Sequence, residues 1–527
     1  MPDQLTERLE LIANPEHSHL LTGLQRGIEK ESLRICNNGK LAQTPHPQAL
    51  GSALTHPHIT TDFSEALLEF ITPVFSDIDE SLECLDKVHR FTYPNLDGEL
   101  LWTASMPCIL EGDDNIPVAQ YGSSNVATMK TAYRKGLGNR YGRLMQTISG
   151  IHYNFSLPDD LWASLQKQDY DKRSLQDYKT ESYFKLIRNF RRFSWLLIYC
   201  YGASPAVCKS FLRGNSGHNL EELDNGTVYL PYGTALRMGD LGYQSNAQEN
   251  LKICYNSIDN YIDTLRRAIT NTHPDYEKIG IKVDGDYRQL SDALLQIENE
   301  FYSPIRPKRV TQSGETPIGA LKERGVEYIE VRCIDVNPYL PLGIDADQIR
   351  FIDCFLLYCL FERSPLCDDD DRELINYNLK AVVNRGREPN LQLKARTGDR
   401  SLNDWANKLL DGVDKIAAQL DTAYGGDDYQ RVCQQQREKI DDASLTPSAA
   451  ILADMEKQQQ PFFRFAMDLA EQHGNDFCSR PLTGEDLDYF LQKTELSKQQ
   501  QAEIEAADTI SFDKYLADYY RQYSDLT

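Results

Sequence analysis

Four short segments of the chain alternate apolar with polar residues, and this period of two residues is the feature that most constrains the fold. Residues two apart in a β-strand point to the same face of a sheet. The alternation therefore predicts four strands, each with one apolar face and one face that carries polar side chains. The segments are residues 23–34, 66–72, 149–155 and 326–335.

The polar faces carry carboxylates and one imidazole. Glu29 and Glu31 share a face of the first segment, and Glu69 lies in the second. In the third, His152 points away from the apolar side, and in the fourth Glu330 does the same. A sheet that packs one face on helices and lines a polar cavity with the other would produce this pattern.

These side chains, together with Asp62 just before the second strand, form a candidate metal-binding set. Oxygen-rich ligands suit Mg²⁺, and one imidazole is compatible with Mg²⁺ or Mn²⁺. Bound cations would relieve the repulsion between the carboxylates and would let an acidic protein hold a nucleotide. Arg332, two residues after Glu330, could place a fixed positive charge beside a transferred phosphoryl group. For each glutamate taken alone, a solvated strand face or an ion pair is the alternative.

Composition excludes several classes of protein. The net charge of −23 disfavours nucleic acid and anionic membranes as partners. The acidic N-terminus has no apolar segment of a secretory signal, and no apolar run is long enough to span a bilayer. The 12 cysteines occur without C-x-x-C or zinc-ligand spacing, which is typical of reduced thiols in the cytoplasm.

The pattern changes near residue 350. Residues 351–361 are apolar and predict a buried helix, and residues 367–373 predict a solvated acidic loop. Apolar residues from Trp405 to Leu420 recur at helical spacing, with Gly425 and Gly426 as a helix end, and residues 502–523 are also helical. We therefore predict an α+β fold for residues 1–527 as one unit, with a sheet-bearing part to about 350 and a mainly helical part over 351–527.

The chain lacks both the G-x-x-x-x-G-K-[ST] loop and the G-x-G-x-x-G fingerprint, so a nucleotide would have to bind through metals and scattered cations. Two basic islands are candidates, although each could also be a solvated surface. In the second, PIRPKR, Arg309 is a candidate phosphate or ATP contact. The basic residues of the islands are Lys130, Arg134, Lys135, Arg140 and Arg143, and then Arg306, Lys308 and Arg309.

Longer motifs indicate a resemblance to a known family. GLQRGIEKESLR, GSALTHPHITTDFSEALLEFITP, AQYGSSN, NRYGRLMQTISGIHYNFSLP, QIENEFYSPIRPKR and GVEYIEVRCIDVNP closely resemble the glutamate–cysteine ligase family, of the proteobacterial type that begins glutathione synthesis. The resemblance runs from about residue 20 to 420. It implies a glutamine synthetase-like core, in which a curved antiparallel sheet forms a funnel with helices outside. It also implies a reaction in which ATP phosphorylates the γ-carboxylate of glutamate and the amine of cysteine displaces phosphate.

The resemblance assigns roles to individual residues. Glu330 and Arg332 would be catalytic, Arg332 by facing the transferred phosphoryl group, and Arg237 would bind a substrate carboxylate. The implied metal ligands are Glu29, Glu31, Asp62, Glu69, His152 and Glu330, the set that the alternation had assembled. The implied cysteine pocket is Phe63, Tyr133, Leu137, Gln146, Tyr243 and Tyr302.

The family also implies two or three Mg²⁺ ions, replaceable by Mn²⁺, with ATP as co-substrate. It favours a monomer, and the thiols favour the cytoplasm. Glutathione contains the same γ-glutamyl and cysteinyl groups, so we expect it to inhibit by competing at the glutamate and cysteine subsites. Two other enzymes fit the same carboxylates: another glutamate–amine ligase of the glutamine synthetase-like superfamily, and a metal-dependent phosphohydrolase. A non-enzymatic ion-binding protein is a third alternative, although the chain has no D-x-D-x-D-G loop.

Overall fold

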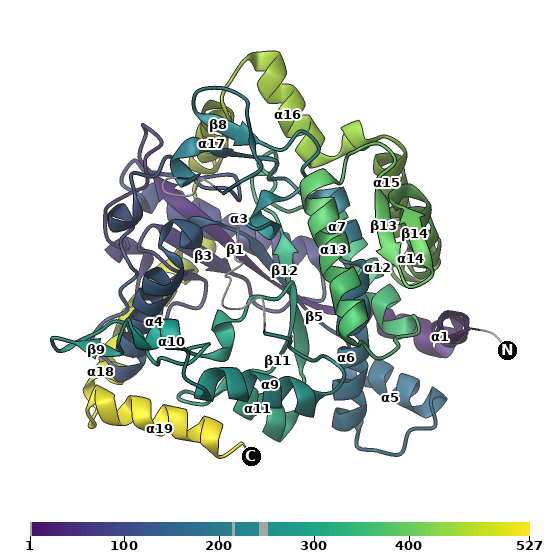
Figure 1. Ribbon diagram of the computed structural model, residues 1–527, viewed down its shortest axis with the longest axis horizontal. Helices are drawn as coiled ribbons and strands as arrows, with labels where there is room; N and C mark the ends of the chain where they lie inside the picture. Colours follow the sequence, from purple (N-terminus) through teal and green to yellow (C-terminus); the bar gives the residue numbers. More distant parts are fainter. Residues whose placement is uncertain (1–2, 213–216, 242–250, 527) are drawn as a thin grey trace.

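The computed structural model describes residues 3–212, 217–241 and 251–526. Within these residues the central element is a seven-stranded antiparallel sheet, in the order β11-β12-β5-β1-β3-β2, with β4 paired to β1 (Figure 1). The four segments that alternate in the sequence form β1, β3, β5 and β12. The strands are β1 (Gln25–Ile35), β2 (Ile59–Thr61), β3 (Leu67–Ile71), β4 (Leu100–Leu101), β5 (Ile151–Ser156), β11 (Ile305–Lys308) and β12 (Tyr328–Ile334).

The apolar face of the sheet is buried, as the alternation predicts. On β5, Ile151, Tyr153 and Phe155 are almost fully inaccessible to solvent. Helices cover this face, and their own apolar residues join the same core. The α+β class, with an antiparallel sheet surrounded by helices, is therefore confirmed. The helices in this layer include α3 (Ile78–Thr92), α6 (Leu175–Phe193) and α12 (Ala346–Phe361).

The predicted buried helix is the C-terminal part of α12, and its one charged residue has a structural partner. The carboxylate of Asp353 accepts hydrogen bonds from Arg26 Nε at 2.8 Å and from Tyr153 Oη at 2.6 Å. Both side chains of the Arg26–Asp353 pair have no exposed surface. Removing one member of a buried ion pair costs about 3–5 kcal/mol, so this pair fixes α12 to β1 and β5 behind the polar face.

Beyond α12, the described chain is helical except for one hairpin, formed by β13 (Gln392–Ala395) and β14 (Gly398–Ser401). The predicted apolar stripe lies on α14, which ends at Gly425 with φ = 84° and packs against α1 (Gln4–Ala13). The predicted helical tail is divided between α18 and α19. These helices are α13 (Asp369–Arg385), α14 (Leu402–Tyr424), α15 (Asp428–Asp441), α16 (Pro447–Gln458), α17 (Phe462–Ser479), α18 (Gly484–Ala507) and α19 (Phe512–Ser524).

The prediction of a solvated loop over residues 367–373 is wrong. Asp368 caps α13 by accepting a hydrogen bond from Asp371 N at 3.0 Å, and Asp369, Asp370 and Asp371 form the first turn. Short side chains with an acceptor oxygen favour the cap position, and negative charge is stabilised by the helix dipole at that end. An acidic run of this kind is therefore as compatible with a helix start as with a loop.

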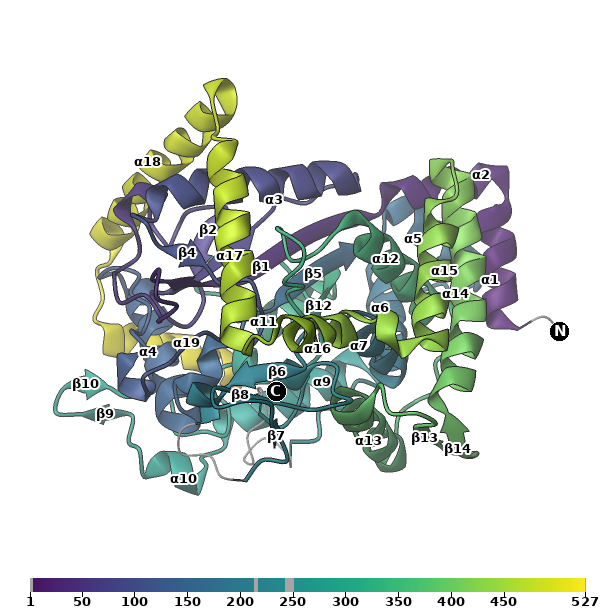
Figure 2. The same cartoon turned by 90° about the horizontal axis from the view of Figure 1, so that it is seen from above.

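The remaining elements surround the sheet (Figure 2). No helix in the described ranges combines the length and apolarity needed to cross a membrane. The helices are α2 (Pro15–Ser18), α4 (Asn125–Tyr141), α5 (Asp159–Gln168), α7 (Trp195–Tyr201), α9 (Ile258–Thr270), α10 (Pro274–Glu277) and α11 (Pro317–Arg324). The strands are β6 (Ala206–Cys208), β7 (Glu221–Glu222) and β8 (Thr227–Tyr229) in one small sheet, with β9 (Lys282–Val283) and β10 (Asp286–Tyr287) in a hairpin.

Candidate active site

A cavity of about 1210 Å³ lies over the polar face of the sheet. The strands contribute its acidic side, and α4 and β11 contribute basic and aromatic side chains. All of the predicted metal ligands line this cavity, and Arg332 lines it as well. The predicted metal ligands that line the cavity are the carboxylates Glu29, Glu31, Asp62, Glu69 and Glu330 and the imidazole of His152.

Strand register brings these side chains together. Glu29 on β1 is the cross-strand partner of His152 on β5, and Glu31 is the partner of Glu69 on β3. Glu330 on β12 lies opposite Asn154, two residues along β5 from His152. Because β5 lies between β12 and β1, segments about 300 residues apart in the sequence present their carboxylates to one another.

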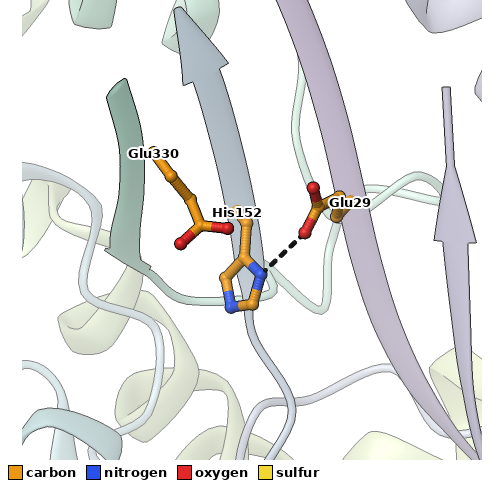
Figure 3. A group of neighbouring side chains, drawn as sticks. All are labelled: Glu29, His152 and Glu330. Atoms are coloured by element: carbon orange, nitrogen blue, oxygen red, sulfur yellow. Dashed lines mark hydrogen bonds and ion pairs between the residues drawn. The ribbon is translucent and has the colours of Figure 1, made fainter. Parts of the chain in front are cut away.

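Three of the side chains form a compact group (Figure 3). Glu29, His152 and Glu330 each offer a ligand atom, and these atoms lie within 4.8 Å of one another. His152 Nδ1 lies 3.1 Å from Glu29 Oε2, and Asn154 Nδ2 donates to Glu29 Oε1 at 2.9 Å. Two carboxylates and one imidazole at this separation fit a divalent cation such as Mg²⁺ or Mn²⁺.

Positive charge holds one part of the acidic face ionised. Glu330 lies 3.2 Å from Lys308 Nζ and 3.1 Å from Arg332 Nη1. Burial acts to raise the pKa of Glu330, but Lys308 and Arg332 outweigh it and hold the pKa well below its usual range. At Glu29 burial also acts upward, and the hydrogen bond with His152 brings the net pKa below the ordinary value.

In the other part of the acidic face, the nearby positive groups do not outweigh burial and the neighbouring acids. Burial raises the pKa of Glu31. The pKa of Glu69 lies well above its usual range, first because of burial and then because of the charges of Glu29, Asp62 and Glu31. Ionising both side chains requires positive charge nearby, which a second cation beside Glu31, Asp62 and Glu69 would supply.

Cations from both basic islands line the same cavity as the carboxylates. Lys130, Arg134 and Arg140 line it from α4, and Arg306 and Lys308 line it from β11. Burial and the neighbouring Arg134 lower the pKa of Lys130 to about 8. Although the protein has a net negative charge, one wall of the cavity is therefore basic and suits phosphate oxygens.

Five of the residues predicted for the cysteine pocket also line the cavity. Tyr133 and Leu137 are one turn apart on α4, as their spacing predicts. The sixth, Tyr243, lies outside the described residues. The five are Phe63, Tyr133, Leu137, Gln146 and Tyr302.

Two residues predicted to contact substrates, Arg237 and Arg309, are not among the described residues that line the cavity. Arg237 is 1% exposed, and its Nη2 donates to the carbonyl oxygen of Arg332 at 2.8 Å, behind the acidic face. Arg309 Nε donates to Gly325 O at 2.8 Å, and among the described residues Arg309 is not part of the cavity lining. Its neighbour Lys308 reaches the cavity instead.

Sequence reasoning missed several lining residues. Tyr515 and Tyr519 reach the cavity from α19, and Glu300 reaches it from the segment before β11. Glu300 Oε1 accepts hydrogen bonds from Arg140 Nη1 at 2.9 Å and from Tyr141 Oη at 2.5 Å. No local pattern distinguishes these residues from ordinary helix and turn residues.

A family model described as glutamate–cysteine ligase matches residues 9–382 of the chain. The chain belongs to the glutamate–cysteine ligase family. The glutamate–cysteine ligase of Pseudomonas aeruginosa PAO1 is 50% identical over 519 residues, which cover 98% of each chain. That of Alcanivorax borkumensis is 51% identical over 525 residues, which cover 98% of this ligase chain and 99% of its relative. The family predicted from the motifs is thereby confirmed.

Comparison with solved structures supports the family assignment. The crystal structure of glutamate–cysteine ligase from Francisella tularensis in complex with AMP matches this ligase chain with a TM-score of 0.90 and 38% identity, and the match covers 96% of this chain and 99% of that one. A bifunctional glutathione synthetase from Pasteurella multocida matches with a TM-score of 0.71 and 23% identity, over 91% of this chain and 55% of that one. The second likeness shows a shared fold alone.

Proposed function

We propose that this chain catalyses the ATP-dependent joining of the γ-carboxylate of glutamate to the amine of cysteine, giving γ-glutamylcysteine, ADP and phosphate. This reaction is the first step of glutathione biosynthesis. The observation that carries the proposal is the cavity in which Glu29, His152 and Glu330 face a basic wall. Membership of the glutamate–cysteine ligase family supports it, and the AMP complex of the Francisella relative supports an adenine nucleotide as co-substrate.

The chemistry requires activation of a carboxylate, which is a poor electrophile at neutral pH. Transfer of the γ-phosphoryl group of ATP to a γ-carboxylate oxygen of glutamate forms a γ-glutamyl phosphate and releases ADP. The unprotonated amine of cysteine then attacks the acyl carbon, the new C–N bond forms, and the C–O bond to phosphate breaks. Phosphate leaves with the electron pair, and the amine loses a proton.

We propose that the acidic face holds two or three Mg²⁺ ions, with Mn²⁺ as a substitute. Glu29, His152 and Glu330 would hold one ion, and Glu31, Asp62 and Glu69 would hold another. Bound Mg²⁺ would supply positive charge that offsets the negative charge developing during phosphoryl transfer. The other contributions to catalysis come from side chains of the protein.

Arg332 is the residue we assign to the transferred phosphoryl group. Its guanidinium is fixed by Glu330 at 3.1 Å. Burial acts to lower the pKa of Arg332, but the charge of Glu330 and its other neighbours outweighs burial and raises it, so the guanidinium stays protonated. From the PIRPKR segment we assign the phosphate contact to Lys308 rather than Arg309, because Lys308 lines the cavity. A preorganised cation stabilises a transition state without reorganisation at the moment of reaction.

Substrate recognition would use the other walls. We assign the thiol side chain of cysteine to the aromatic and apolar group Phe63, Tyr133, Leu137, Gln146 and Tyr302, together with Tyr243. The motifs assign Arg237 to a substrate carboxylate, but its guanidinium is buried and donates to the carbonyl oxygen of Arg332, so we assign it to holding Arg332 in place. Glutathione contains both γ-glutamyl and cysteinyl groups, so we expect it to inhibit by competing with glutamate. We expect a cytoplasmic monomer, and the 12 free cysteines are compatible with a reducing compartment.

One assay tests the proposal. The chain is incubated with glutamate, cysteine, ATP and Mg²⁺, and products are identified by mass spectrometry. We expect γ-glutamylcysteine and one phosphate for each peptide bond formed. Turnover with ammonia but none with cysteine would identify a different glutamate–amine ligase. Phosphate release without any amine acceptor would identify a phosphohydrolase.

A further inference from the structure

The C-terminal helix α19 forms part of the wall of the cavity, although it lies more than 100 residues beyond the part of the chain that the family model matches. Tyr515 and Tyr519 on this helix line the cavity. Figure 1 shows α19 in yellow near the C-terminus, and the helix packs against α4 and α9. Two sets of hydrogen bonds connect this C-terminal segment to residues 296–300 and to the N-terminus of α4.

The first set joins α19 to residues 296–300. Tyr523 is fully buried, and its hydroxyl donates to Glu298 Oε2. Tyr520 Oη donates to the carbonyl oxygen of Gln296 at 2.7 Å. The other carboxylate oxygen of Glu298 accepts from Ile318 N at 2.8 Å, in the first turn of α11. Two tyrosines of α19 thus hold the segment that precedes β11.

The second set joins the chain just before α19 to the N-terminus of α4. Glu505 Oε1 accepts from Ser123 N at 2.8 Å, and Asp508 Oδ2 accepts from Asn125 N. Asn125 Nδ2 donates to Ile510 O at 3.1 Å. These carboxylates satisfy backbone N–H groups at a helix N-terminus, where negative charge is favourable.

The two connected walls meet at the proposed cysteine pocket. Gln296 Nε2 donates to the carbonyl oxygen of Tyr133 on α4 at 3.2 Å, and its Oε1 accepts from Leu290 N at 2.9 Å. The approach is so close that a Cβ added to Gly136 would lie 2.0 Å from Gln296 Oε1. A shift of residues 296–300 would therefore also shift the backbone of α4 at Tyr133.

We propose that α19 is a positioning element of the amine-acceptor pocket. Tyr520 and Tyr523 are positioning residues: they hold Gln296 and Glu298, and through Gln296 they fix Tyr133 against the acceptor. The helix sets the distance between α4 and residues 296–300, and with it the affinity for cysteine. This inference rests on the proposed function, because it assigns Tyr133 to the acceptor side chain.

The test uses the full chain with the double substitution Tyr520→Phe and Tyr523→Phe, which removes two hydroxyls and keeps both rings. Tyr377→Phe, on the partly exposed face of α13, is the matched control. We expect the KM for cysteine to rise about fivefold or more in the double variant, the effect of weakening a hydrogen bond in the pocket. The KM for glutamate should stay within about twofold of the wild-type value, because α19 bonds to residues 296–300 and not to the strands that carry the acidic face.

Hydrogen exchange gives a readout that does not depend on turnover. Peptides that cover residues 128–137 should exchange faster in the double variant than in the control. An unchanged KM for cysteine, or equal rises in the KM for cysteine and for glutamate, would overturn the inference. Absence of γ-glutamylcysteine from the wild-type reaction would instead overturn the proposed function, and hydrogen exchange would still report whether α19 holds α4.

Discussion

Glu31 on β1 and Glu69 on β3 are direct cross-strand partners, so a buried carboxylate and a half-buried one oppose each other on the same face of the sheet. Like charges in this position destabilise a strand pair. Burial raises the pKa of both groups, and the nearby acids raise that of Glu69 further. An arrangement that is unfavourable without nearby positive charge is typical of a site built to receive cations.

The first prediction concerns Glu69→Gln. The folded pKa of Glu69 is raised, so the unfolded chain releases this proton at lower pH, and stability is lost as pH rises above about 4.5. Glutamine does not ionise, so Glu69→Gln removes this loss of stability. In metal-free buffer at pH 7 we expect the free energy of unfolding, measured by urea denaturation, to increase by about 1 kcal/mol or more. Turnover should fall about 100-fold, because a predicted metal ligand is gone.

Glu323→Gln, on an exposed side chain of α11, is the control and should change neither quantity. The stabilisation by Glu69→Gln should also shrink as the pH approaches 4.5, where the unfolded chain keeps its proton. A lower free energy of unfolding at pH 7 would show that Glu69 stabilises the fold, contrary to the prediction.

The second prediction concerns Glu330→Gln. The carboxylate is held ionised by Lys308 and Arg332, and it belongs to the group around His152. Removing its charge should weaken Mn²⁺ binding, measured by electron paramagnetic resonance of the free ion, by about 10- to 100-fold. Turnover should fall at least as far, while the circular-dichroism spectrum stays that of the wild type. Unchanged Mn²⁺ affinity would exclude Glu330 as a ligand.

Much of the polar face could be predicted because local alternation decides it. Burial of one face of a strand fixes which residues face the cavity, so the sequences around Glu29, His152 and Glu330 were sufficient to bring them to the same side of the sheet. Register and strand order then bring them within 4.8 Å, and neither property is encoded locally.

Other features depend on boundaries or on distant packing. Lys308 is the last residue of β11 and reaches the cavity, whereas Arg309 follows the strand and bonds to Gly325. Both residues are basic, so only the strand end distinguishes them. Tyr519 becomes a cavity residue through the docking of α19, which involves contacts with residues more than 200 positions earlier in the chain.

The third prediction concerns Gly150→Ala. Gly150 N donates to Glu31 Oε2 at 2.6 Å, and a Cβ at this position would lie 2.0 Å from Arg237 Nη2. Because Arg237 is buried, its guanidinium cannot move aside freely. We expect the free energy of unfolding to fall by about 1–3 kcal/mol, as for other overpacked sites. Turnover should also fall, since Arg237 bonds to the backbone of Arg332.

Gly226→Ala is the control for this substitution. A Cβ there would lie 3.5 Å from Asp224 Oδ1, an ordinary contact. Urea denaturation and turnover of the two variants are compared under the same conditions. If Gly150→Ala matched Gly226→Ala in both measurements, the close approach of Arg237 would have no energetic consequence.

The fourth prediction concerns pH and His56. This side chain is 5% exposed, and its Nδ1 accepts hydrogen bonds from His58 N at 3.2 Å and Ile59 N at 3.0 Å. A ring nitrogen that accepts cannot carry a proton, so the native ring is neutral. Burial, with the charges of His58 and His46 next, lowers the pKa of His56 to about 3.

The unfolded histidine binds a proton near pH 6.5, whereas the native one does not until about pH 3. The free energy of unfolding should therefore fall as the pH drops below 6.5, by about 1.4 kcal/mol per pH unit from this residue. In His56→Asn, the amide oxygen can accept the same backbone hydrogen bonds without titrating. Urea denaturation between pH 5 and 7.5 should show a slope reduced by about one proton in His56→Asn and unchanged in His19→Asn, on an exposed side chain. Identical slopes for the two variants would mean that His56 is already protonated in the native protein.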